Sequence, residues 1–254
     1  MSDPTPKNPA LIEVIFELRW HIPAIAPGVR VDPKYKIGLG MLYERLKAKY
    51  PYHEQLSSAD LPEEIALHTV QHRFRTAKNE WPVVQVGPGI VTLNDVKDHS
   101  WSDFSERIKE LLDAIEEVFS ISEYESLSIV HINAFNLDFS KENVFNFLKE
   151  HTKIGITAND ELFSDGKVAN HPLDIELRAS FQSKEPVGMI TFRFLKGFRE
   201  GKEILVLENI CSVDKPNVPK GKDETLTWFK SAHELLEEWL FKMVSDKLLR
   251  SGEQ

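Results

Sequence analysis

The predicted secondary-structure elements of this 254-residue chain follow one another in the same order twice, and this repetition limits the folds available to it. Each half predicts a strand, a helix, several strands and then a long helix. The long helix opens near a tryptophan and a phenylalanine in both halves, at Trp101 and Phe104 and again at Trp228 and Phe229. An order of elements that recurs in this way indicates one structural unit used twice.

The two predicted copies comprise residues 11–120 and 126–250, and together they form a single domain. The segment 1–10 is polar and contains three prolines. We therefore expect it to be a flexible tail and not a signal peptide.

The first copy begins with the clearest strand pattern in the chain, LIEVIFELRW at residues 11–20. Apolar residues alternate there with a largely charged row, which is typical of a strand with one buried face. An aspartate and a proline at 32–33 predict the start of a helix that ends at Tyr50, before a proline. Residues 52–63 are predicted to be a polar loop and residues 64–76 a strand.

The end of the first copy holds two apolar runs, WPVVQVGPGIVTLND at residues 81–95, joined by a glycine–proline–glycine segment that predicts a turn or a bulge. The following helix, from Trp101 to Phe119, places its large apolar residues three and four positions apart. Ser100 and Asp103 resemble a helix-capping pair.

The second copy predicts a strand near residues 127–137, a short helix after Ser140, and a polar loop at 155–172 that we expect to be mobile. Three strands are predicted at 174–182, 188–195 and 203–213, followed by a helix from Thr225 to about Arg250. The whole pattern is that of an α+β protein. A duplicated strand–helix–strands–helix unit predicts a curved antiparallel sheet with helices on one side, as in the TATA-box-binding protein. The alternative is a helix-grip sheet around one long helix.

Composition restricts the function. The net charge is −9, which disfavours a general affinity for the phosphate backbone of nucleic acids. No apolar run approaches the roughly 20 residues that cross a bilayer. The single cysteine, Cys211, lies in an apolar segment and is predicted to be an inert thiol of the core. These features predict a cytoplasmic protein without a membrane segment.

We find no motif for catalysis, metal binding or nucleotide binding. His68 and His72 are four residues apart, but in the predicted strand their rings lie roughly 13 Å apart, too far for one metal ion. The glycines at 87 and 89 lack the rest of a dinucleotide or phosphate loop. The sequence therefore predicts neither a metal nor a cofactor, and it favours a non-enzymatic role.

Candidate ligand or partner residues are polar side chains on otherwise apolar strands. The candidates on the first strand and on the strand after 174 could share one open sheet surface. The alternative interpretation assigns them no function and treats this surface as a solvated face with cross-strand ion pairs. A histidine and an asparagine in the middle of the predicted strand 127–137 could line a pocket, or they could be a hydrogen-bonded pair of the core. The candidates are Glu13, Glu17, Arg19, His131, Asn133, Asp174, Glu176 and Arg178.

Basic residues cluster around the turn before residue 203: Arg193, Lys196, Arg199 and Lys202. Together with the lysines of 214–223 they could contact nucleic acid, although no aromatic residues are interleaved with them. A solvated sheet edge is the other interpretation, since lysine blocks pairing between edges.

Three segments taken together resemble a known family: PALIEVIFELRW at 9–20, WPVVQVGPGIVTLND at 81–95 followed by WSDF at 101–104, and SIVHIN at 128–133. The family comprises proteins of about this length that occur sporadically among bacteria and archaea. Its members tend to have Arg-Tyr-Ile-Asn where this chain has Val-His-Ile-Asn at residues 130–133, and this difference argues against a shared role for a basic residue at this place. The resemblance implies one domain spanning the chain and genes that move as cassettes, often with defence or toxin–antitoxin components.

The function that we expect is therefore a non-enzymatic protein-binding or accessory module, whose partner could be encoded by an adjacent gene. An oligomer is compatible with the sequence. One alternative is a protein with a ligand-binding or hydrolytic pocket, built from His131, Asn133 and the strand with Arg178. The second is a nucleic-acid-binding protein that uses the basic turns at 193–222.

Overall fold

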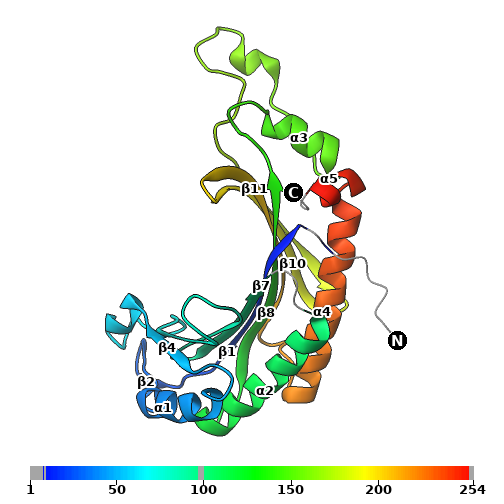
Figure 1. The fold of residues 1–254 in the computed structure, drawn as a ribbon. Helices are drawn as coiled ribbons and strands as arrows, with labels where there is room; N and C mark the ends of the chain where they lie inside the picture. Colours follow the sequence, from blue (N-terminus) through cyan, green and yellow to red (C-terminus); the bar gives the residue numbers. More distant parts are fainter. Residues whose placement is uncertain (1–7, 9, 97–99, 252–254) are drawn as a thin grey trace.

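The computed structural model describes residues 8, 10–96 and 100–251. Its main feature is a curved sheet of nine strands, all antiparallel to their neighbours, in the order β4-β5-β6-β7-β1-β8-β11-β10-β9 (Figure 1). The strands are β1 (Leu11–Trp20), β4 (Tyr52–Gln55), β5 (His72–Arg75), β6 (Val83–Gly87), β7 (Ile90–Val96), β8 (Tyr124–Asn136), β9 (Glu176–Lys184), β10 (Val187–Arg199) and β11 (Lys202–Asp214).

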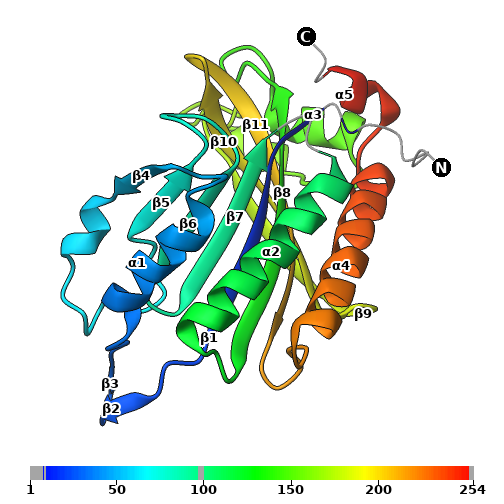
Figure 2. The same cartoon turned by 60° about the horizontal axis from the view of Figure 1, so that its bottom comes forward.

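The helices cover one face of this sheet and leave the other face open (Figures 1 and 2). Three of them, α1 (Tyr35–Leu46), α2 (Trp101–Phe119) and α4 (Lys222–Met243), lie side by side across it. Two short helices, α3 (Val144–His151) and α5 (Asp246–Ser251), lie beyond the end of α4. None of the described helices is long and apolar enough to span a membrane. The predicted α+β class, with a curved antiparallel sheet and helices on one side, is confirmed.

The strand pattern of β1 determines which face the helices cover. Val14, Phe16, Leu18 and Trp20 are buried, and the ring of Phe16 packs against Phe229 of α4 with centroids 4.4 Å apart. Because successive side chains of a strand point to opposite faces, the charged residues between them face away from the helices. The alternation in LIEVIFELRW therefore fixes the orientation of the whole sheet through its central strand.

The core consists of two clusters of buried apolar side chains on the helix-covered face. The larger cluster lies between β1, β7, β8 and the helices α1, α2 and the first half of α4. The smaller cluster lies under α3, α5 and the end of α4, against β10 and β11. Trp239 of α4 packs against both clusters and joins them.

Several predicted boundaries are wrong. The predicted strand 64–76 is reduced to β5, because residues 62–71 turn back and approach Gly87. The predicted loop 52–63 contains the edge strand β4, and a two-stranded hairpin, β2 (Ala24–Ala26) with β3 (Val29–Arg30), precedes α1. The last predicted helix is two helices, since α4 ends where Val244 becomes extended.

The end of the predicted flexible tail is fixed to the sheet. The Asn8 side chain donates a hydrogen bond of 2.8 Å to the Asn133 side chain, and Ala10 is buried. Residues 1–7 and 9 lie outside the described residues, so the prediction of flexibility is not tested there. The polar segment at 155–172 contains one turn of 3-10 helix (Asp160–Phe163) and no strand.

Candidate functional site

The open face of the sheet has an apolar centre. Ile15 of β1 lies beside Val130 of β8, which lies beside Ile210 of β11, and Ile132 is the next outward-facing residue along β8. Each of these four side chains is partly exposed. No described helix crosses this face (Figures 1 and 2). We call these four residues the aliphatic strip.

A network of side-chain hydrogen bonds runs across four strands on one side of the aliphatic strip. Arg73 donates to Gln85 (2.8 Å), and Gln85 donates to Thr92 (3.1 Å) and to Asn94 (3.0 Å). Thr92 donates to the Asn94 oxygen (2.7 Å), and Asn94 in turn donates to a Glu13 carboxylate oxygen (2.7 Å). Thr92 and Asn94 are buried although they point away from the helices. The network therefore holds the Glu13 carboxylate in one position at the border of the strip.

Gln85, Thr92 and Asn94 are the site residues that sequence reasoning missed. All three belong to WPVVQVGPGIVTLND, whose pattern predicts two apolar runs and a turn or bulge but no site. The signal was present, since Gln85, Thr92 and Asn94 each follow a buried apolar residue of their strand. Two such strands joined by a tight turn align their polar residues on one face.

The remaining predicted charges form the border of the strip. Glu17 and Arg19 face outward from β1 and are ion-paired at 2.8 Å. Across the sheet, Arg193 of β10 is ion-paired with Glu176 (3.0 Å) and Glu208 (3.4 Å). The structure thus places the charges of the first strand and those of β9 on one surface. Arg178 lies beside Arg193 on the same face, whereas Asp174 precedes β9 and caps the backbone N–H of the next residue.

The predicted pocket around His131 and Asn133 does not form. Both side chains are buried on the helix-covered face, where a His131 ring nitrogen lies 3.2 Å from a His233 ring nitrogen of α4. The Asn133 side chain donates a 3.4 Å hydrogen bond to the backbone oxygen of Leu207. Arg178 projects from the opposite face. Because side chains two apart on β8 share a face, both residues belong to the core and cannot join Arg178 in one cavity.

The four residues of the predicted basic patch do not form one continuous surface either. Arg193 and Lys196 are three residues apart on β10 and therefore point to opposite faces. Lys196 is ion-paired with Glu203 at 2.5 Å and lies over the Phe139 ring. Only Arg199 and Lys202 lie opposite each other, at the tip of the β10–β11 hairpin. This distribution leaves no continuous basic surface around the turn.

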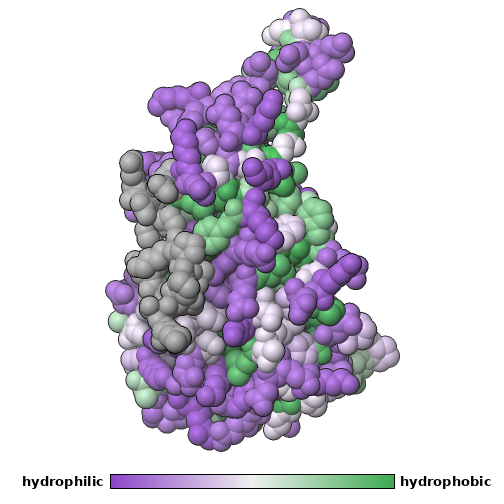
Figure 3. Space-filling view, turned by 90° about the vertical axis from the view of Figure 1, so that its right-hand side faces the viewer, coloured by the Kyte–Doolittle hydropathy of each residue, from purple (hydrophilic) through white to green (hydrophobic). Residues whose placement is uncertain are grey.

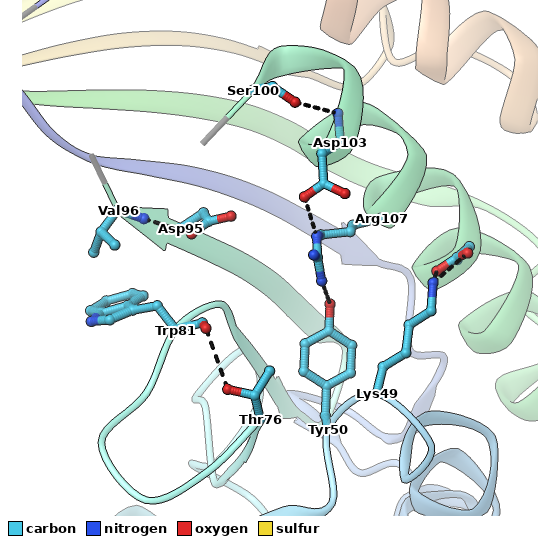
Figure 4. Close-up of polar contacts among 10 residues, drawn as sticks. Lys49, Tyr50, Thr76, Trp81, Asp95, Val96, Ser100, Asp103 and Arg107 are labelled. Carbon is cyan, nitrogen blue, oxygen red and sulfur yellow. Dashed lines mark hydrogen bonds and ion pairs between the residues drawn. The ribbon is translucent and has the colours of Figure 1, made fainter. Parts of the chain in front are cut away.

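Asp103 of the WSDF motif and the preceding Ser100 make structural contacts at the start of α2 (Figure 4). The Ser100 side chain accepts a 3.1 Å hydrogen bond from the Asp103 backbone, and Asp103 accepts a 2.7 Å bond from Arg107. Arg107 also donates to the Tyr50 hydroxyl at 3.3 Å, which ties the segment after α1 to α2. The Trp101 ring stacks on His233, with centroids 3.8 Å apart. Asp103 and Trp101 of the motif therefore contact other parts of the chain.

A cluster of ionisable side chains lies where β1 ends and β8 begins. Glu125 lies 2.8 Å from a His21 ring nitrogen, 3.3 Å from Arg30 and 3.5 Å from a His68 ring nitrogen. Burial lowers the pKa of His68, and this effect outweighs the opposing effects of the Trp20 carbonyl and Glu125. Within the described residues, no group of three histidine, cysteine or acidic side chains is arranged to hold a metal ion.

The single cysteine and one surface cavity are the remaining features that we considered as a site. Cys211 is buried, and burial raises the pKa of its thiol to about 12. A cavity of about 600 Å³ lies between the end of α2, the start of β8 and the loop 215–221. Glu116, at its border, is hydrogen-bonded to Tyr124. Lys215 and Lys220 of the predicted basic loop line this cavity, whereas the candidate residues on the strands do not.

A scan of protein-family models finds none that matches this chain, and a search of curated proteins finds no match. The geometry of the open face is therefore the basis for an assignment of function.

Proposed function

We propose that this chain is a non-enzymatic protein-binding module and that its partner docks on the open face of the sheet. The observation that supports this proposal is the aliphatic strip, a set of partly exposed branched side chains on three neighbouring strands with no described helix over them. Protein interfaces typically combine an apolar centre with a polar border. The strip and its border of charged residues have this arrangement.

The charges of the border favour a protein over nucleic acid as the partner. Acidic and basic side chains alternate around the strip, in the pairs Glu17–Arg19 and Glu208–Arg193. Nucleic-acid affinity depends on many unpaired cations, because each phosphate contact releases a counterion. A protein surface with apolar side chains flanked by charges of both signs matches this face better.

The order of the strands supports a second part of the proposal, that the two halves are copies of one unit. Outward from β1 the strands of the first half follow as β7, β6, β5 and β4, and outward from β8 those of the second half follow as β11, β10 and β9. In each half, the first strand is central and the last strand pairs with it. This is the arrangement expected of the duplicated, TATA-box-binding-protein-like unit, whose open face is likewise the side without helices.

The resemblance to a sporadically distributed prokaryotic family supports a partner encoded by an adjacent gene, as in a mobile defence or toxin–antitoxin cassette. The experiment places a photo-crosslinking amino acid at Val130, in the strip, and in a matched protein at Ile37, which is 73% exposed on α1. Both proteins are expressed and irradiated in the cells from which the gene comes. Mass spectrometry then identifies the crosslinked protein. We expect one protein to be crosslinked from Val130 and not from Ile37.

The purified pair then provides the quantitative test. Ile132→Asp places a charge in the strip, and we expect it to weaken binding at least about thirtyfold, as at an interface hot spot. Ile37→Asp makes the same chemical change outside the strip and should leave the affinity within about twofold. Circular dichroism of both variants verifies that the fold is kept. Equal affinities for the folded variants, or equal crosslinking from both positions, would contradict the proposal.

A further inference from the structure

The two edges of the nine-stranded sheet differ in length and in protection. The edge strand β4 has four residues, whereas β9 at the other edge has nine. Only one side of β9 is paired, with β10, so alternate N–H and C=O groups along its outer side have no strand partner in the described part of the chain. Proteins usually protect an edge by keeping it short, by proline or by charge. The segment 179–183 of β9 contains neither proline nor charge.

Apolar side chains are exposed beside this edge. Phe181 of β9 is 48% exposed, and Val187, at the start of β10, is 51% exposed. The ring of Phe181 lies against Trp239 of α4, with centroids 5.5 Å apart, so the exposed surface continues from the strand onto the helix. Figure 3 shows apolar surface among hydrophilic residues on the side of the molecule that carries α4. A long edge strand with an uncharged central segment and an exposed aromatic ring favours pairing with another strand.

We propose that β9 pairs with β9 of a second copy of this chain, antiparallel, with a two-fold axis at Ser180. The sequence ELRASFQSK is complementary to itself in this register. Glu176 lies opposite Lys184 of the second copy, and Lys184 lies opposite its Glu176. Because the contact is symmetric, each complementary pair occurs twice.

The side that faces α4 is complementary in shape. Ala179 lies opposite Phe181 of the second copy, so a small side chain faces a large one on each side of the axis. The two Phe181 rings are diagonal neighbours, within the reach of aromatic side chains across a pair of strands. Both rings extend the apolar surface formed with Trp239.

The neighbouring registers are less favourable, which singles out the one centred on Ser180. A shift of two residues toward the β9–β10 turn places Arg178 opposite Lys184, and like charges directly opposite each other destabilise strand pairing. A shift in the other direction places Glu176 opposite Gln182 and loses the ion pair. A shift of one residue would bring apolar side chains opposite polar ones from the other face.

Charge exchange tests the register in the full-length protein. Light scattering after size-exclusion chromatography should show a dimer for the unchanged chain. Glu176→Lys and Lys184→Glu, each alone, create two repulsive contacts per dimer, and each should raise the dissociation constant about tenfold or more. The double variant restores opposite charges and should recover dimerisation. A monomeric unchanged chain overturns the proposal, as does a dimer that either single exchange leaves unaffected.

Cysteine crosslinking tests the position of the axis independently of affinity. Facing residues of antiparallel strands lie about 4.5–5.5 Å apart, within the Cα range of a disulfide. Ser180→Cys should therefore form a disulfide-linked dimer under mild oxidation. Gln182→Cys, on the same strand and face, should not, because that residue faces Arg178 of the second copy. The native Cys211 is buried and does not compete. Absence of the Ser180 crosslink, or equal crosslinking at both positions, refutes this axis.

Discussion

Asn94→Asp is an almost isosteric change that tests whether the hydrogen-bond network on the open face holds the Glu13 carboxylate. In the structure, the Asn94 amide nitrogen donates a 2.7 Å hydrogen bond to Glu13, while its oxygen accepts bonds from Gln85 and Thr92. An aspartate keeps the accepting oxygen. It replaces the donor with a second carboxylate oxygen that points at the first carboxylate.

The expected effect has two parts. A hydrogen bond to a charged group contributes about 1.5–3 kcal/mol to stability, and this contribution is lost. Two adjacent carboxylates then repel each other, which raises the pKa of the pair in the folded state above its value in the unfolded chain. The folded state of the variant consequently binds a proton more readily than its unfolded chain, so the loss in free energy of unfolding becomes smaller as the pH falls. We expect a loss of about 3 kcal/mol near pH 7.5 and a loss smaller by at least about 1 kcal/mol near pH 5.

Urea unfolding of the unchanged chain and of the variant at the two pH values measures this difference. The matched control is Asn136→Asp, the same substitution at an exposed position of β8. It should change the free energy of unfolding by less than about 0.5 kcal/mol at either pH. If Asn94→Asp costs no more than the control, or if its cost is the same at both pH values, the network does not hold Glu13 as described.

Three further outcomes are expected. Phe16→Ala should reduce the free energy of unfolding by about 3–5 kcal/mol, because the Phe16 ring is fully buried. Phe198→Ala should change this free energy little, because the Phe198 ring is 69% exposed. Similar losses for the two variants in denaturant melts would contradict the described core. Gly87→Ala should destabilise the fold strongly, since its methyl carbon would lie 1.8 Å from the backbone oxygen of Thr69. The control is Gly155→Ala, whose methyl carbon would have no atom within 4 Å beyond its own and the adjacent residues. Equal midpoints of thermal unfolding for the two variants would rule out close packing at Gly87. Burial lowers the pKa of His72 below 6.5, so the folded state takes up this proton less readily than the unfolded chain and stability should fall as the pH drops below about 6.5. His72→Gln should flatten that dependence, and an unchanged slope would show that another group causes it.

The candidate site was only partly predictable. The alternation in β1 correctly separated the buried residues from Glu13, Glu17 and Arg19, because strand periodicity assigns the faces without knowledge of the neighbours. The aliphatic strip was not predicted, because strands β1, β8 and β11 come from distant parts of the chain. Which side chains lie next to one another across a sheet depends on strand order and register, which a pattern along one strand does not contain.

His131 shows the same limit. It alternates with apolar residues on β8, a pattern that favours a polar residue of the core and leaves a pocket as the alternative. The structure places it under α4, where it meets His233 from 102 residues further along the chain. The basic residues around the β10–β11 turn are close in sequence, and this closeness predicts one patch. In a strand, however, residues three apart lie on opposite faces.

The sequence by itself determined the class of the fold, the strand pattern of β1, the amphipathic helix α2 and the repeated order of elements. These properties are local, since they arise from side-chain periodicity and capping within one segment. Only the tertiary structure decided which face of the sheet stays open, which residues from distant strands form the strip and its border, and which edge is left long and unpaired. Those properties depend on contacts between segments far apart in the chain, and the free energy of burial that selects them belongs to the assembled fold.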